Sequence, residues 1–279
     1  MKFIKSQSTG GGHVELFYED WGTGNPVVFI HGWPLDHQMW EYQTRVLPAM
    51  GLRCIVYDRR GFGKSDKPWS GYDYDTFADD LKAVLDHLDL ENVTLVGFSM
   101  GGGEVVRYFS RHGGKRVSKI VLLASIAPFT LKTEDNPDGV PKEVFDGIIT
   151  ALEKDRADFL TGLLKVFYGV NENSQPVSQS MLNWNLALGM QASPKATIDC
   201  VRAFGETDFR SEMGSINVPA LVIHGDADNI VPIKPTGEHA AQLIPNAIYK
   251  IYKGAPHGLL VTEKDQFNAD LVEFINTKS

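Results

Sequence analysis

Residues 93–103 read VTLVGFSMGGG. The apolar run Val93–Phe98 predicts a buried strand, and the run Glu104–Ser110 predicts a helix, so Ser99 lies at the turn between them. Glycines two positions before and after the serine complete the pattern G-x-S-x-G. In this pattern a serine sits on a sharp strand-to-helix turn, where larger flanking side chains would collide with the strand and the helix. The stretch therefore predicts an exposed nucleophilic serine rather than a plain glycine-rich turn.

Other short apolar runs are bounded by Gly, Pro, Asn and Asp in the same way; they are Pro26–Ile30, Cys54–Tyr57, Lys119–Ala124, Ala220–His224 and Ile248–Tyr252. Near-continuous apolar strands are typical of a parallel sheet that is buried on both faces. Apolar residues at helical spacing predict a helix over about Thr76–Leu88. The alternation predicts an α/β fold with a mostly parallel, doubly wound sheet, preceded by an antiparallel piece around Val14–Trp21.

The strand pattern stops at about Pro128 and resumes at Val218, and the apolar spacing between them is helical. We therefore expect a core of residues 1–127 and 218–279, with a helical lid of residues 128–217 inserted into it.

A serine hydroxyl needs a general base, usually a histidine that a carboxylate orients. Of the eight histidines, His257 is favoured, because proline and glycine flank it in a loop between a strand and the C-terminal helix. Asp226 and Asp228 follow the strand Ala220–His224, at the edge where open α/β sheets place their sites. The spacing does not choose between the two aspartates, but the order serine, aspartate, histidine is that of α/β-hydrolases.

Acyl transfer also needs two N–H groups directed at the oxyanion. The backbone of Met100, next to the serine, is one candidate. Trp33, which follows the pair His31 and Gly32 after an early strand, is the other, and we expect His31 to buttress that loop.

Nucleotide and metal sites find little support in the sequence. The stretch from Gly61 to Ser65 ends like the phosphate-binding motif G-x-x-x-x-G-K-S. That motif would need a glycine at position 58, where this chain has Asp58. We read the stretch Asp58–Gly63 as a structural turn. The sequence has no H-E-x-x-H motif and no paired-cysteine ligand set, so no metal and no cofactor are expected.

The composition, 43% hydrophobic and 22% charged, is that of a soluble globular protein. The formal net charge of −8 disfavours nucleic acid and anionic lipid as partners. Residues 1–12 lack the apolar run of a secretory signal and no 18-residue apolar stretch occurs, which predicts a cytoplasmic, membrane-free protein. Cys54 and Cys200 are expected to be unpaired core thiols.

Four stretches together resemble the α/β-hydrolase subfamily of bacterial aryl esterases and cofactor-free haloperoxidases, which has a γ-lactamase as a close relative; they are His31–Pro34, Asp58–Ser65, Gly97–Gly103 and Ala255–Gly258. The likeness runs from about Val14 to the end of the chain. It implies a catalytic triad of Ser99, Asp228 and His257, with Asp228 because the family's acid is the second aspartate of His-Gly-Asp-x-Asp. It also implies homo-oligomers, often trimer-based.

The resemblance further implies an acyl pocket lined by aromatic and branched residues. The matching positions in this chain are Phe129, Phe204 and Ile230, with Trp33 beside them.

The expected function is hydrolysis of small carboxylic, chiefly aryl, esters through an acyl-enzyme. Hydrogen peroxide in place of water would give a peracid, which oxidises bromide or chloride without metal or haem. Pro34 restricts the backbone of Trp33 and withdraws one N–H, which would direct the Trp33 carbonyl at a bound peroxide. Activity should fall as the pH drops through about 6.5, where a free histidine protonates.

Two alternatives stay open at this point. One is a γ-lactamase or amidase that uses the same triad, and the other is a ligand-binding protein that keeps the fold without turnover.

Overall fold

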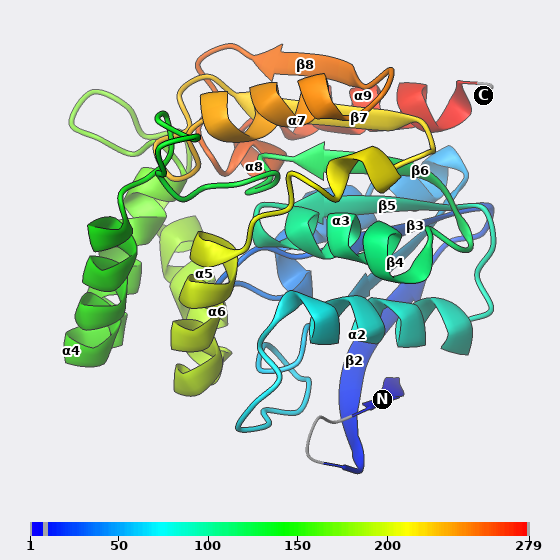
Figure 1. Ribbon diagram of the computed structural model, residues 1–279, viewed down its shortest axis with the longest axis horizontal. Helices are drawn as coiled ribbons and strands as arrows, with labels where there is room; N and C mark the ends of the chain where they lie inside the picture. Colours follow the sequence, from blue (N-terminus) through cyan, green and yellow to red (C-terminus); the bar gives the residue numbers. More distant parts are fainter. Residues whose placement is uncertain (1, 8–10, 278–279) are drawn as a thin grey trace.

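The computed structural model describes residues 2–7 and 11–277, which form an α/β structure around one central sheet (Figure 1). In the described residues the sheet has eight strands in the order β1-β2-β4-β3-β5-β6-β7-β8. The strands are β1 (Phe3–Gln7), β2 (His13–Trp21), β3 (Asn25–Ile30), β4 (Leu52–Tyr57), β5 (Val93–Phe98), β6 (Val117–Leu123), β7 (Ala220–Gly225) and β8 (Ile248–Tyr252).

Strand β2 is antiparallel to both β1 and β4, and every pair from β4 to β8 is parallel. The predicted α/β class, with a mostly parallel sheet and an antiparallel start, is therefore confirmed. Strand β1 was not predicted from the sequence. It is short and pairs with one strand only, so just two of its five residues, Ile4 and Ser6, are buried.

The remaining elements are helical; they are η1 (His37–Trp40), α1 (Glu41–Thr44), η2 (Leu47–Met50), α2 (Tyr74–His87), α3 (Met100–His112), α4 (Lys142–Phe167), α5 (Gln179–Gln191), α6 (Pro194–Glu206), η3 (Met213–Ser215), η4 (Lys234–Glu238), α7 (His239–Leu243), α8 (Leu259–Thr262) and α9 (Lys264–Asn276). None of the described helices combines the length and the apolar character that crossing a bilayer requires.

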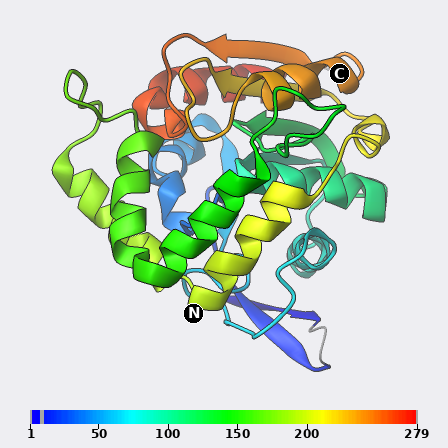
Figure 2. The ribbon, with the colours of Figure 1, turned by 60° about the vertical axis from the view of Figure 1, so that its left-hand side comes forward.

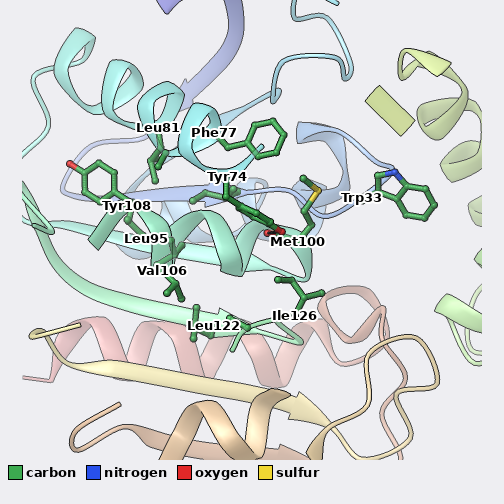
Figure 3. Close-up of a cluster of buried hydrophobic side chains, with 14 of the residues drawn as sticks. Trp33, Tyr74, Phe77, Leu81, Leu95, Met100, Val106, Tyr108, Leu122 and Ile126 are labelled. Atoms are coloured by element: carbon green, nitrogen blue, oxygen red, sulfur yellow. Dashed lines mark hydrogen bonds between the residues drawn. The ribbon is translucent and has the colours of Figure 1, made fainter. Parts of the chain in front are cut away.

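Alternate side chains of each buried strand face opposite sides of the sheet, and this period of two creates two cores. On one side Val28 and Ile30 of β3 pack in the cluster that includes α2 and α3. Figure 3 shows side chains of both helices meeting those of β5 and β6, with Trp33 at the end of the cluster nearest the lid. On the other side Val27 and Phe29 pack with α8 and α9.

The helix after Ser99 begins at Met100, four residues before the predicted start, because Gly101, Gly102 and Gly103 are helical. A Cβ atom at Gly101 would lie 2.6 Å from the carbonyl oxygen of Ile30. The glycines thus let helix α3 approach β3 more closely than any side chain would allow.

Helices α4, α5 and α6 lie in the segment between β6 and β7, where the sequence predicts a lid, and they stand together to one side of the sheet (Figures 1 and 2). Helix α4 is kinked at Asp155, whose φ of −157° and ψ of 93° are not helical. Leu160 and Leu164 of α4 are buried in the two cores of the sheet, one in each. Helix α4 is therefore packed on the sheet.

Both cysteines, Cys54 in β4 and Cys200 in α6, are buried and unpaired, as predicted.

Candidate active site

Ser99 occupies the sharp turn between β5 and α3 with φ of 53° and ψ of −119°. A side chain at this positive φ is strained, and such residues concentrate at functional sites. The turn is held by three backbone hydrogen bonds: the N–H of Ser99 donates to the Leu123 carbonyl at 2.9 Å, and the Ser99 carbonyl accepts from the N–H groups of Gly102 at 3.0 Å and Ile126 at 3.2 Å. A Cβ at Gly97 would lie 2.6 Å from the carbonyl oxygen of Gly101. The glycines of the G-x-S-x-G pattern are thus required by close backbone approach, as the sequence indicates.

His257 and Asp228 reach Ser99 from two other loops. The Nε2 atom of His257 lies 3.0 Å from the Ser99 hydroxyl oxygen, and its Nδ1 atom lies 2.7 Å from Asp228 Oδ2. A carboxylate at Nδ1 holds the proton there, which leaves the Nε2 lone pair free to accept the serine proton. All three side chains are more than nine-tenths buried. The geometry is that of a nucleophile, a base and an orienting acid.

Asp228 is kept ionised by its surroundings. Its Oδ1 atom accepts the N–H groups of Ile230 at 2.9 Å and Val231 at 2.8 Å. Burial raises the pKa of Asp228, but the charge of His257 and the hydrogen bonds with His224 and His257 outweigh it and hold the pKa well below its usual value.

The second aspartate has a different task. Asp226 accepts the N–H of Gly254 through Oδ1 and so ties the β7 loop to the loop after β8. The structure therefore distinguishes the two carboxylates that spacing left open: Asp228 contacts His257, and Asp226 closes the turn.

His224, at the end of β7, was not singled out in the sequence. Its Nε2 atom lies 3.0 Å from the carbonyl oxygen of Val231 and 3.2 Å from Asp228 Oδ2, so Asp228 faces two histidines. The only signal in the sequence was that His224 stands four residues before Asp228. This spacing brings the two side chains together only because the loop after β7 folds back on the strand.

The loop after β3 lies against Ser99. A Cβ at Gly32 would lie 2.6 Å from the Phe98 ring and 3.2 Å from Ser99 Cβ. The backbone N–H groups of Trp33 and Met100 have no hydrogen-bond partner within the described residues. Both remain available to a ligand, as an oxyanion hole requires.

The Trp33 side chain connects this loop with the lid. Its indole N–H donates to the carbonyl oxygen of Thr197 in α6 at 3.0 Å, and its ring packs edge-on against Phe204 at 5.6 Å between centroids. The peptide bond between Trp33 and Pro34 is cis.

The stretch Asp58–Gly63 leaves β4 as a turn, as predicted, and it is wholly buried. Asp58 accepts the backbone N–H groups of His37 and Lys64, each at 2.8 Å, and its Oδ1 lies 2.7 Å from His37 Nδ1. Asp36, His37 and Asp58 bring possible metal-ligand atoms within 4.8 Å of one another. Because the Asp58 oxygens already accept these donors, the cluster is satisfied as a hydrogen-bond network.

Ser99 and His257 open into a pocket of about 240 Å³ between the sheet and the helices α4 and α6. Its lining is apolar apart from a few polar groups; it consists of Trp33, Ser99, Ile126, Thr130, Val140, Val144, Phe145, Ile148, Phe159, Leu163, Phe167, Phe204, Asn229, Ile230, Val231 and His257. His257 is the one ionisable group in this lining. An apolar pocket with few polar groups favours an uncharged substrate group.

Of the expected pocket residues, Trp33, Phe204 and Ile230 line the cavity, and Phe129 does not. The Phe129 ring is buried outside the pocket, where its centroid lies 4.9 Å from the Arg210 guanidinium in a cation–π contact. Helix α4 instead supplies several lining side chains that the sequence shows only as an ordinary apolar face.

The family profile described as alpha/beta hydrolase fold matches residues 25–264. The chain is 46% identical over 265 residues to the non-heme chloroperoxidase CPO-A1 of Kitasatospora aureofaciens, covering 94% of this chain and 96% of that protein. It is 41% identical over 268 residues to the bifunctional esterase/perhydrolase DCH of Acinetobacter calcoaceticus, covering 95% and 97%.

Among solved structures, the bromoperoxidase of Bacillus anthracis superposes with a TM-score of 0.94 at 44% identity, covering 99% of this chain and 100% of that one. The matched region includes β3, the turn at Ser99, the loops that carry Asp228 and His257, and helices α4 to α6. The profile and these relatives show that the chain belongs to the alpha/beta hydrolase fold family.

Proposed function

We propose that this protein is a serine hydrolase that cleaves small carboxylic esters, chiefly aryl esters, through an acyl-enzyme. The observation that carries the proposal is the chain of hydrogen bonds from Asp228 through His257 to Ser99, which ends in an apolar pocket beside two free backbone N–H groups.

In the first half-reaction the Ser99 oxygen attacks the ester carbonyl while His257 Nε2 takes the hydroxyl proton. The carbonyl oxygen becomes an oxyanion, which the N–H groups of Trp33 and Met100 stabilise. Collapse of this intermediate breaks the ester bond, and His257 returns the proton to the leaving alcohol. In the second half-reaction water attacks the acyl-enzyme by the same steps and releases the carboxylic acid.

A second activity is favoured by the relatives, since one is named a bifunctional esterase/perhydrolase and another a non-heme chloroperoxidase. Hydrogen peroxide that attacks the acyl-enzyme in place of water releases a peracid and regenerates Ser99. The peracid then transfers one oxygen to bromide or chloride, and its proton goes with that oxygen, which gives a hypohalous acid and the carboxylate. The peroxide is the oxidant, and the protein needs no cofactor in this scheme.

Two structural assignments belong to the same proposal. Residues 128–217 act as a lid, since α4 and α6 contribute side chains to the pocket. Assembly into a homo-oligomer is proposed from the family resemblance, and sedimentation velocity tests it.

The hydrolase proposal is tested with p-nitrophenyl acetate. Ser99→Ala should abolish turnover, whereas Ser110→Ala, at an exposed position in the helix α3 that follows Ser99, should retain it. Substantial turnover in Ser99→Ala would refute the assignment of the nucleophile.

The peroxide branch is tested by peracetic acid formation from acetate and hydrogen peroxide. Replacing Pro34 with leucine frees the backbone of Trp33 and should slow this reaction more than ester hydrolysis. Equal effects on both reactions would argue against a role of Pro34 in peroxide use.

A further inference from the structure

The oxyanion donor Trp33 shares a peptide unit with the Gly32 carbonyl, and His31 contacts that carbonyl. The Nδ1 atom of His31 lies 2.9 Å from the Gly32 oxygen. Because the peptide is planar, a bond that holds its C=O also fixes the direction of its N–H. An amide whose carbonyl accepts a hydrogen bond is also more polarised, which strengthens its N–H as a donor.

The backbone of Arg59 determines which His31 nitrogen carries the proton. The Arg59 backbone N–H donates to His31 Nε2 at 2.9 Å, so Nε2 must be unprotonated. In a neutral ring the proton is then on Nδ1, where it points at the Gly32 oxygen. The Arg59 guanidinium lies 3.5 Å from Nδ1, which is a far poorer contact than the 2.9 Å bond to Gly32.

His31 is also kept neutral. It is completely buried, and burial together with the positive charge of Arg59 lowers the pKa of His31 to about 3, although the charge of Asp58 opposes the shift. The ring therefore remains the Nδ1–H donor at any pH at which the protein is assayed.

A buried ion pair connects this arrangement to the nucleophile helix. Arg59 donates to the His31 carbonyl at 2.9 Å and, through Nε, to Glu104 at 2.8 Å. Glu104 lies in α3, which begins directly after Ser99, and both charged side chains are fully buried. The two halves of the oxyanion hole are thus held at a fixed separation by one chain of contacts.

We propose that His31 is a positioning residue for catalysis, which orients and polarises the Trp33 N–H through its hydrogen bond to the Gly32 carbonyl. Arg59 and Glu104 hold His31 in place relative to α3. The inference rests on the proposed hydrolase function. It concerns the rate of forming the oxyanion and not the binding of the substrate.

The test compares two amides at position 31. Asparagine places an N–H near the Nδ1 position and keeps the bond to Gly32, whereas glutamine places its amide near Nε2 and keeps only the bond with Arg59. We expect His31→Asn to keep kcat within about threefold, and His31→Gln to lose about 10- to 100-fold, less than the ~10²–10³ for a deleted donor. KM should change little in either variant, because the oxyanion does not exist in the bound substrate.

A trifluoromethyl ketone gives the matching readout. Ser99 adds to its carbonyl carbon, the proton goes to His257, and the carbonyl oxygen becomes an oxyanion in the hole. Its inhibition constant should rise in His31→Gln by the same factor as kcat/KM falls. His37→Asn is the matched control, since His37, at the start of η1 six residues further along the chain, is also buried but bonds Asp58. It should leave kcat and the inhibition constant unchanged.

Equal losses in the two His31 variants, or a larger loss in His31→Asn, would overturn the proposal. If neither variant folds, nitrogen-15 NMR of the wild-type histidines decides it: the expected result is an Nδ1–H tautomer for His31 that does not titrate between about pH 5 and 8. An Nε2–H tautomer would overturn it. Retained activity in Ser99→Ala would instead refute the underlying function, so the two failures are distinct.

Discussion

The buried histidine behind the oxyanion loop should make the protein less stable in mild acid, and one substitution isolates this effect. His31 has a folded-state pKa of about 3 against 6.5 for the free group. Between these two pH values the unfolded chain binds a proton at this site and the folded chain does not. The free energy of unfolding therefore falls as the pH drops below 6.5, and the loss is complete only near pH 3.

Each pH unit in this window costs about 1.4 kcal/mol. From pH 6.5 to pH 5 the single group should remove about 2 kcal/mol, with no discount for solvent because the side chain is fully buried. His31→Asn lacks the titrating group. Although the variant is less stable at pH 7, its deficit relative to wild type should shrink by about 2 kcal/mol at pH 5.

Urea unfolding of both proteins at pH 7, 6 and 5 measures this deficit. His37→Asn is an informative control, because the shift of His37 has the opposite sign. Burial lowers the pKa of His37, but the hydrogen bond and charge of Asp58 outweigh it and raise the pKa. His37 therefore stabilises the folded protein below its unfolded-state pKa, and this stabilisation is lost as the pH rises through its folded-state pKa. The loss of unfolding free energy in His37→Asn relative to wild type should therefore grow toward low pH. Parallel pH curves for wild type and His31→Asn would refute a neutral, buried His31.

Three further substitutions test other contacts of the site. Gly101→Ala places a Cβ 2.6 Å from a carbonyl oxygen of β3 and should cost about 1–3 kcal/mol in unfolding free energy and most of the activity; an unchanged melting temperature would contradict this close approach. Trp33→Phe removes the indole N–H that donates to Thr197 and should cost about 1 kcal/mol in urea unfolding, and a stability equal to wild type would argue against this link to the lid. His224→Phe removes the second histidine beside Asp228 and should lower kcat about tenfold, equal to about 1.4 kcal/mol, with little change in KM; an unchanged kcat would show that the position of Asp228 does not depend on His224.

Much of the fold was predictable because strand signals depend on local composition. The run at 93–98 became a fully buried strand with the predicted bounds, since it is apolar and is followed by a turn residue. The run at 248–252 also has the predicted bounds, but the expectation that it is buried on both faces is wrong, because β8 lies at the edge of the sheet and leaves Ile248 and Ile251 exposed. Strand β1 was missed because a short edge strand buries few residues. The start of α3 was misplaced because glycine is a poor helix former, and only close packing against β3 explains helical glycines there.

The site was predictable where a motif dictates backbone geometry, and less so where side chains meet by tertiary packing. Spacing alone could not separate Asp226 from Asp228, because both follow the same strand and only the returning β8 loop gives them different partners. Phe129 could not be excluded from the pocket in advance, since its neighbour Arg210 is far away in sequence. Helical periodicity shows which face of α4 is apolar, but not that part of this face lines a cavity.

The two ends of the helical insert meet at the sheet, and this has a consequence for how the family can diversify. The backbone N–H of Phe209 donates to the Pro128 carbonyl at 2.9 Å, and the neighbouring strands β6 and β7 pair directly, with Leu123 opposite Ile223. Because the insert leaves and rejoins the sheet at neighbouring strands, contacts at its base hold its two ends together. Doubling its length adds only about 0.6 kcal/mol of closure entropy. The junction therefore tolerates helical inserts of different length, provided that each still supplies apolar side chains such as Leu160 and Leu164 to the two cores of the sheet. Each such insert would present different side chains to the pocket beside Ser99.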